Sequence, residues 1–286
     1  MWLAGPWAAG RAVAMRAVAG RAAARRQHRA KRCRPAPAPA QVGELQRLRT
    51  LELSYAECYR ADVITRLTAL ERLKLDYSLH EWPPGLSRLT ALRWLGVEQD
   101  DTDPALDWDP LAEALPYLQR LTHLGVAGNV SVPHGPSALA CLAGLRSLRW
   151  ALSESGPGEA LPPGAWLAGV TRLEATSQVL AVSLPALAAA TQLQELSVCP
   201  GADSILALAL QAPQPLAMPA MALQRLALWA AGAPSLRLLA FTAQPQLDFG
   251  AWSALLQLQA QRPALQIGAG PEPWSEPFWD NEGNDE

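Results

Sequence analysis

The chain has 286 residues, of which 50% are hydrophobic and 17% are charged, so it can bury the core of one large domain or two small ones. No apolar run approaches the roughly 18 residues that a membrane span needs, so no membrane span is expected. The four cysteines are too widely spaced for a disulfide framework or a zinc site, which predicts reduced thiols in an intracellular protein: Cys33, Cys58, Cys141 and Cys199.

Residues 1–42 are predicted to form a disordered basic leader that ends in a stiff proline–alanine linker, residues 35–40. Residues 1–43 hold nine basic residues and no acidic one, although the whole chain has a formal net charge of −2. Three interpretations stay open: an unstructured leader with a misassigned start, an organellar (chloroplast or mitochondrial) transit peptide, or a nuclear signal or nucleic-acid-binding arm within residues 11–34. The absence of serine from the leader argues against a transit peptide. A cytoplasmic location is favoured, with organellar and nuclear locations as alternatives.

From residue 43 onward, leucines recur with one spacing. Leu45, Leu48, Leu51 and Leu53 are separated by three, three and two residues, and later segments repeat this pattern. The second apolar residue of each final pair serves as a marker, and the steps between markers are 22, 22, 29, 24, 25, 23, 30 and 39 residues. The markers are Leu53, Leu75, Val97, Val126, Trp150, Ala175, Val198, Leu228 and Ile267. The 39-residue step leaves room for one degenerate copy around residues 236–241.

Each copy predicts a short strand in which the two apolar residues point inward and the residue between them points outward. One copy cannot cover its own apolar face, so neighbouring copies are expected to stack around a continuous core. Three segments predict helices on the other side. Asp109 is expected to cap a helix with Pro110 at its first position, Asp203 to cap a second helix, and residues 249–260 to form a third.

This pattern resembles the leucine-rich-repeat family over residues 43–270. Residues 82–95 (WPPGLSRLTALRWL) and 161–175 (LPPGAWLAGVTRLEA) are similar to the plant-type variant, which suggests a plant or green-algal lineage. The resemblance implies an α/β fold, a leucine-rich-repeat solenoid or horseshoe of nine or ten repeats, with a parallel concave sheet and a mixed helical and irregular convex side. The family's buried asparagine is matched only by Asn129, so its hydrogen-bond ladder should be incomplete.

No motif for catalysis or for a cofactor occurs in the sequence. GxGxxG, GxxxxGK[ST] and GxSxG are all missing, and the histidines do not pair at metal-ligand spacing. The acidic stretch EQDDTD at residues 98–103 lacks the glycine and the distal glutamate of a calcium loop, so a solvated loop is expected. Asn129 begins a glycosylation sequon, but modification is not expected at a buried position. The chain is therefore not expected to be an enzyme or to bind a metal, a cofactor or a small-molecule substrate.

Partner-binding residues are expected on the concave face, where tryptophan and arginine are typical of recognition hot spots. They are Glu52, Arg72, Lys74, Asp76, Trp94, Glu98, His123, Arg149, Arg172 and Glu174. The expected function is a non-enzymatic protein–protein interaction module, such as a receptor or adaptor subunit, with a protein partner of unknown identity. The alternatives are association with nucleic acid through residues 11–34 and regulation of a partner enzyme, either a GTPase or a phosphatase.

Residues 271–286 (PEPWSEPFWDNEGNDE) form an acidic, aromatic tail. Three interpretations stay open for it: a short linear motif, a cap that covers the apolar end of the last repeat, or plain disorder.

Overall fold

The computed structural model describes residues 47–54, 64–76, 81–99, 104–153, 160–199, 220–241 and 249–269. All of them belong to one of the two units into which the chain divides, Ala40–Glu286, and the other unit is Met1–Pro39. The predictions for the leader, for the tail, for a helix capped by Asp203 and for most of the acidic stretch at residues 98–103 lie outside the described residues.

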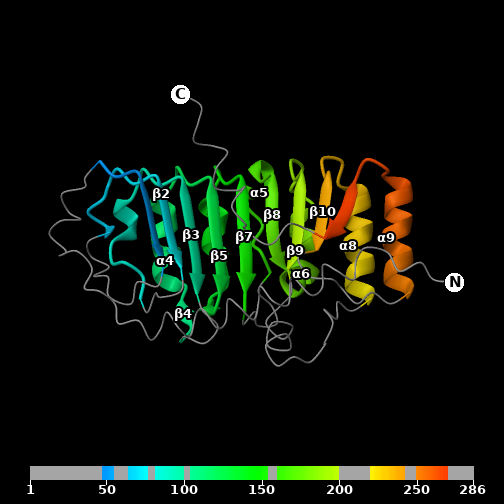
Figure 1. Ribbon diagram of the computed structural model, residues 1–286, viewed down its shortest axis with the longest axis horizontal. Coiled ribbons are helices and arrows are strands. Elements are labelled where there is room, and N and C mark those ends of the chain that lie inside the picture. The colour runs from blue at the N-terminus through cyan, green and yellow to red at the C-terminus, as the bar shows by residue number, and fades with distance from the viewer. Residues whose placement is uncertain are drawn as a thin grey trace, which may run out of the picture. The chain divides into compact units, whose positions relative to one another are not determined.

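Short parallel strands line up in chain order along one sheet (Figure 1). Successive strands pair directly, and the sheet has nine strands in the described part of the chain. They are β1 (Thr50–Ser54), β2 (Arg72–Asp76), β3 (Trp94–Gln99), β5 (His123–Gly128), β7 (Ser147–Leu152), β8 (Arg172–Thr176), β9 (Glu195–Cys199), β10 (Leu238–Phe241) and β11 (Gln266–Ala269). A second, two-stranded parallel sheet joins β4 (Leu106–Asp107) to β6 (Val130–Ser131). The expected α/β class with a parallel sheet is confirmed.

The register of the sheet places the marker residues side by side. Leu53 pairs with Leu75, Leu75 with Val97, and Val97 with Val126. The same row continues through Trp150, Ala175 and Val198. All seven side chains are buried in one hydrophobic cluster. A strand alternates its side chains between two faces, so this register gives the sheet one continuous apolar inward face.

The eighth marker was wrong. Leu228 lies in helix α8 (Ala220–Gly232) and is 75% exposed, and the next strand is β10, in which Phe241 pairs with Val198. Residues 220–232 consist mostly of strong helix formers. Their buried positions also follow a helical period: Leu223, Leu226, Ala227 and Ala230. The degenerate copy predicted around residues 236–241 is therefore strand β10.

The last marker was displaced by two residues. Ile267 pairs with Leu239, the first inward residue of β10, and Ala269 pairs with Phe241. Ile267 therefore occupies the first inward position of β11, and a small residue occupies the second.

Helices pack against the inward face, because their buried leucines share one core with the strands. They are α4 (Asp109–Ala114), α5 (Trp166–Gly169), α6 (Ser177–Leu187), α8 and α9 (Phe249–Gln261), with short 3₁₀ helices η1 (Leu86–Arg88), η2 (Leu115–Tyr117) and η3 (Ser137–Cys141). Figure 1 shows the α-helices following one another along the sheet in chain order. The predicted helix at residues 249–260 is confirmed as α9.

Two helix starts differ from expectation. Asp109 is the first residue of α4 and not its cap, and its backbone N–H donates to Asp107 Oδ1 at 3.1 Å. Helix α6 was not predicted. It begins directly after β8, where the Thr176 side chain accepts a hydrogen bond from the Val179 N–H. A strand that passes into a helix without an intervening turn gives no loop signal in the sequence.

Candidate binding groove on the outward face of the sheet

The outward face of the sheet is the face opposite the inward leucines, and the predicted site residues occupy three rows across it. The first row consists of register partners at the start of the strands: Arg72, Trp94, His123, Ser147, Arg172 and Glu195. The second row, two residues further along the strands, holds Glu52, Lys74, Gly96, Gly125, Arg149 and Glu174. Asp76 and Glu98 pair in the third row.

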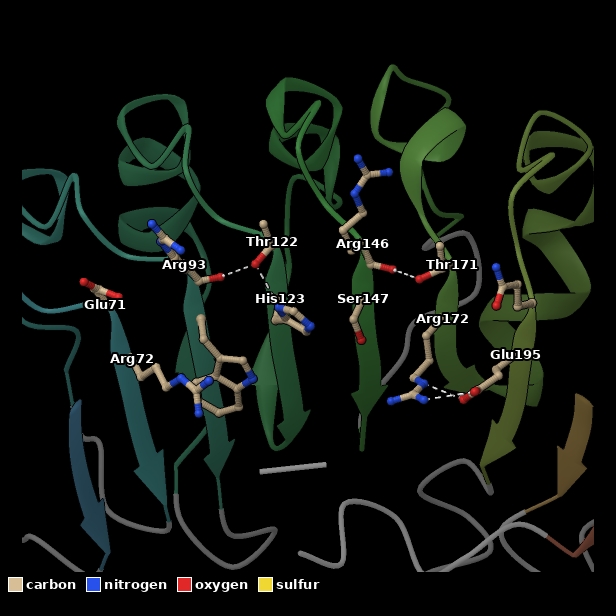
Figure 2. Close-up of a pocket in the computed structure, with 12 residues that line it drawn as sticks. Glu71, Arg72, Arg93, Thr122, His123, Arg146, Ser147, Thr171, Arg172 and Glu195 are labelled. Carbon is tan, nitrogen blue, oxygen red and sulfur yellow. Dashed lines mark hydrogen bonds and ion pairs between the residues drawn. The ribbon is translucent and has the colours of Figure 1, made fainter. Parts of the chain in front are cut away.

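A groove with a volume of about 580 Å³ runs across the first row, from β2 to β9 (Figure 2). It is lined by the first-row residues and by the residue immediately before each strand: Glu71, Arg93, Thr122, Arg146, Thr171 and Gln194. Of the ten predicted site residues, the groove brings together Arg72, Trp94, His123 and Arg172. The other six, on the second and third rows and in β1, are not among its lining residues.

Positive charge predominates in the groove, which has four arginines against two glutamates. The Arg172 guanidinium binds Glu195 through two hydrogen bonds, from Nε to Oε2 at 2.5 Å and from Nη2 to Oε1 at 2.9 Å. Glu71 lies 3.6 Å from the exposed Arg49 guanidinium. Both acidic groups of the groove are therefore already matched by an arginine.

Arg93 and Arg146 are exposed, and no carboxylate offsets their charge within the described part of the chain. Arg146 Nη1 donates to the backbone carbonyl of Gly169 at 3.0 Å, a neutral acceptor. For Arg93, no side-chain hydrogen bond or ion pair exists among the described residues. An arginine in this state can form two parallel hydrogen bonds with an incoming carboxylate.

Two threonines fix the backbone on which these arginines stand. Thr122 Oγ1 donates to the carbonyl of Arg93 at 3.0 Å, and Thr171 Oγ1 donates to the carbonyl of Arg146 at 3.2 Å (Figure 2). The same carbonyls accept the N–H groups of Thr122 and Thr171 at 2.8 and 2.7 Å. Thr122 Oγ1 also lies 2.8 Å from His123 Nδ1, a contact in which the ring tautomer sets which atom donates. The groove wall is thus held by side chains as well as by the sheet.

Trp94 differs from the exposed residue that the sequence predicts, because only 7% of it is exposed. Its ring lies along the strand over Gly96, where an added Cβ would stand 2.1 Å from Trp94 Cη2. The glycine leaves room for the ring to lie against the sheet, so Trp94 forms part of the groove floor. The Trp-Leu-Gly sequence at residues 94–96 is the signal that could have revealed this position.

Ser147 is a groove residue that the sequence analysis missed. It is buried, and its Oγ has no hydrogen-bond partner among the residues that the structure describes. A buried hydroxyl without a partner is destabilising by roughly 1–3 kcal/mol, so a ligand oxygen that reached it would relieve that cost. Ser147 stands between His123 and Arg172 in the first row, as Figure 2 shows.

Five of the six predicted residues in the second and third rows pair with one another, and the side chain of the sixth, Asp76, lies outside the description. Lys74 Nζ donates to Glu52 Oε1 at 3.0 Å. Arg149 Nε donates to Glu174 Oε1 at 3.2 Å, and Arg149 Nη1 also lies 3.9 Å from Glu98. Glu174 is 8% exposed, so its pair with Arg149 is largely withdrawn from water. Each of these five charges therefore has an opposite charge on another strand of the sheet.

The cysteines of the described region are free thiols with little thiolate character. Burial is the main cause that raises the pKa of Cys199, the Glu174 carboxylate raises it further, and Arg149 partly opposes the shift. Burial also raises the pKa of Cys141, whose Sγ donates to the Ala138 carbonyl at 2.9 Å. The thiolate is the reactive form, so both groups should be slow nucleophiles in the folded protein.

We expect iodoacetamide at neutral pH to alkylate Cys199 at least about 100-fold more slowly in the folded chain than in denaturant. Mass spectrometry of the separated peptides reports each cysteine individually, and half-buried Cys141 should react at an intermediate rate. Equal labelling of Cys199 in the folded and unfolded chain would show that the end of β9 is open to solvent.

No family model matches this sequence, and no curated protein is detectably similar to it. Within the described ranges, no helix is long and apolar enough to cross a membrane. The described residues also contain no group of three or more His, Cys, Asp or Glu side chains arranged to hold a metal ion.

Proposed function

We propose that this chain is a leucine-rich-repeat solenoid, and that it binds a partner protein on the outward face of its sheet, centred on the groove. Support for the repeat comes from the apolar pairs of successive strands, which occupy equivalent register positions although the strands are 22 or more residues apart in sequence. Units that cannot bury their own apolar face are expected to stack in this way.

The observation that carries the binding function is the arrangement of Arg93 and Arg146 at one edge of the groove, with Trp94 in its floor. Arginine and tryptophan are enriched in binding hot spots. The backbone of both arginines is fixed by the threonine hydrogen bonds. A partner would therefore meet a surface that needs little ordering on binding, which favours affinity.

The function is proposed as non-enzymatic because both threonine hydroxyls of the groove are already hydrogen-bonded within the protein. The Thr122 and Thr171 hydroxyls donate to backbone carbonyls, and His123 Nδ1 is held by Thr122. A nucleophile and a general base would have to lie within hydrogen-bond distance of each other with the nucleophile's proton available. Nucleic-acid association through residues 11–34, regulation of a partner enzyme, and the compartment stay predictions, because no described residue bears on them.

Affinity capture with paired variants tests the proposed surface. The full chain with Arg93→Glu and Arg146→Glu should lose its specific partner at least about tenfold relative to the unchanged chain, since two arginine contacts become repulsive. The matched control is Arg225→Glu with Arg237→Glu, which makes the same change in charge at exposed arginines that do not line the groove.

Quantitative mass spectrometry of the captured proteins, followed by a direct titration with the purified partner, measures the effect. The groove variant should fail and the control should bind like the unchanged chain. Equal recovery by both variants would place the partner elsewhere and would contradict the proposed function.

A further inference from the structure

The acidic tail, residues 271–286, matches the chemistry of the groove. It has six acidic residues and no basic one, and it contains Trp274, Phe278 and Trp279. The groove presents two guanidinium groups without a carboxylate partner, a tryptophan floor and a buried serine hydroxyl that has no hydrogen bond. The negative charge of the tail is complementary to the positive charge of the groove, and both contain tryptophan.

The tail can reach the groove. The last described strand, β11, ends at Ala269, and the nearest lining residue on the sheet is Glu195 in β9, two strands away. Two strand spacings are about 10 Å, and the six spacings from β11 to β3 are about 29 Å. Crossing from the end of a strand to its start adds about 15 Å. These two displacements are perpendicular, so the path from Ala269 to the start of β3 is about 33 Å, and the eleven residues to Asp280 span up to about 37 Å when extended.

The spacing of the acids also fits the spacing of the arginines. Arg93 and Arg146 precede β3 and β7, which are separated by β5 alone, so their backbones stand about 10 Å apart. Glu272, Glu276 and Asp280 recur every four residues, or about 13 Å in an extended segment. The length of the arginine side chains covers the difference, so one extended tail can pair both guanidinium groups at once.

We propose that the acidic tail binds the groove of its own chain and so competes with the partner protein for the same surface. This inference rests on the proposed function, because it assigns an internal competitor to the proposed binding surface. Attachment to the same chain gives a tethered segment of this length an effective concentration of the order of millimolar, so even a weak contact would occupy the groove. A partner would then have to displace the tail before it binds.

The test uses the full chain and a fluorescein-labelled synthetic peptide with the sequence of residues 271–286. The unchanged chain should bind this peptide weakly, because its own tail fills the groove. A variant with Glu272→Gln, Glu276→Gln and Asp280→Asn should bind the peptide at least about tenfold more tightly, and added salt should weaken that binding. Fluorescence anisotropy measures both affinities.

Adding Arg93→Glu and Arg146→Glu to the triple tail variant should abolish peptide binding, whereas adding Arg225→Glu and Arg237→Glu should not. Equal peptide affinity of the unchanged chain and the triple tail variant would overturn the proposal. So would peptide binding that survives the Arg93 and Arg146 substitutions, which would point to a cap at the end of the sheet. Either result would leave the proposed function standing if partner capture still required the two arginines.

Discussion

Replacement of Trp150 by alanine should lower the free energy of unfolding by about 3–5 kcal/mol, the range for removing a large aromatic side chain from a packed core. Trp150 points inward from β7 and is 0% exposed. Its ring packs edge-on against Trp108, with ring centroids 4.9 Å apart and planes at 88°. The substitution removes the apolar contact and leaves a cavity between the sheet and the segment that leads into α4. Urea unfolding followed by circular dichroism measures the loss.

Two comparisons separate this packing from a general sensitivity to substitution. Tyr117→Ala removes an aromatic ring that is 61% exposed and should change the free energy of unfolding by less than about 0.5 kcal/mol. Trp150→Phe should lose less than half as much as Trp150→Ala. The phenylalanine keeps an aromatic contact and removes an indole N–H that is buried without a hydrogen-bond partner. A loss below about 1 kcal/mol for Trp150→Ala would contradict the described core.

The first seven strands could be predicted from sequence because the apolar pair of each strand must meet the pairs of its neighbours. A shift of one residue in any of them would turn its leucines toward the outward face. Because of this constraint, the sequence spacing of Leu53, Leu75 and Val97 predicts which residues pair between neighbouring strands. It holds where successive copies follow at steps of 22 to 29 residues.

The constraint fails beyond Val198, because 43 residues separate it from its register partner Phe241 and include a helix whose leucines match the repeat spacing. The spacing Leu223, Leu226, Leu228 fits a strand-forming copy as well as it fits α8. Only the added burial of Ala227 and Ala230 distinguishes the helical period, and alanine is a weak signal of burial in a chain this rich in alanine. The error at Leu228 follows from this ambiguity, whereas the displacement at Ile267 arises because β11 contains only one large apolar residue.

The groove could be predicted only in part, for a geometric reason. Strand alternation identifies Arg72, His123 and Arg172 as outward residues, but it says nothing of the residue that precedes a strand. Arg93 and Arg146 occupy that position and line the groove from the turn. Their recurrence directly before β3 and β7 was visible in the sequence. The burial of Trp94 could not be inferred from alternation alone, since it depends on the missing side chain of Gly96.

Gly128→Ala should destabilise the protein by about 2–4 kcal/mol, because the position combines a left-handed backbone with a close approach to the neighbouring strand. Gly128 ends β5 with φ at 85° and pairs with Gln99 of β3. A Cβ at this position would stand 1.8 Å from the Gln99 carbonyl oxygen, which belongs to the backbone and cannot rotate away. The end of β3 or β5 would have to move. Thermal and urea unfolding measure the change.

Gly135→Ala provides the matched control for this prediction. Gly135 also has a left-handed backbone, with φ at 70°, but no atom lies within 4 Å of the added Cβ. Its substitution should cost about 1 kcal/mol, the contribution of the left-handed conformation alone. The difference between the two variants therefore isolates the contact with Gln99. Equal losses would mean that β3 and β5 separate at their ends without penalty, and the paired register of Gln99 with Gly128 would then be wrong.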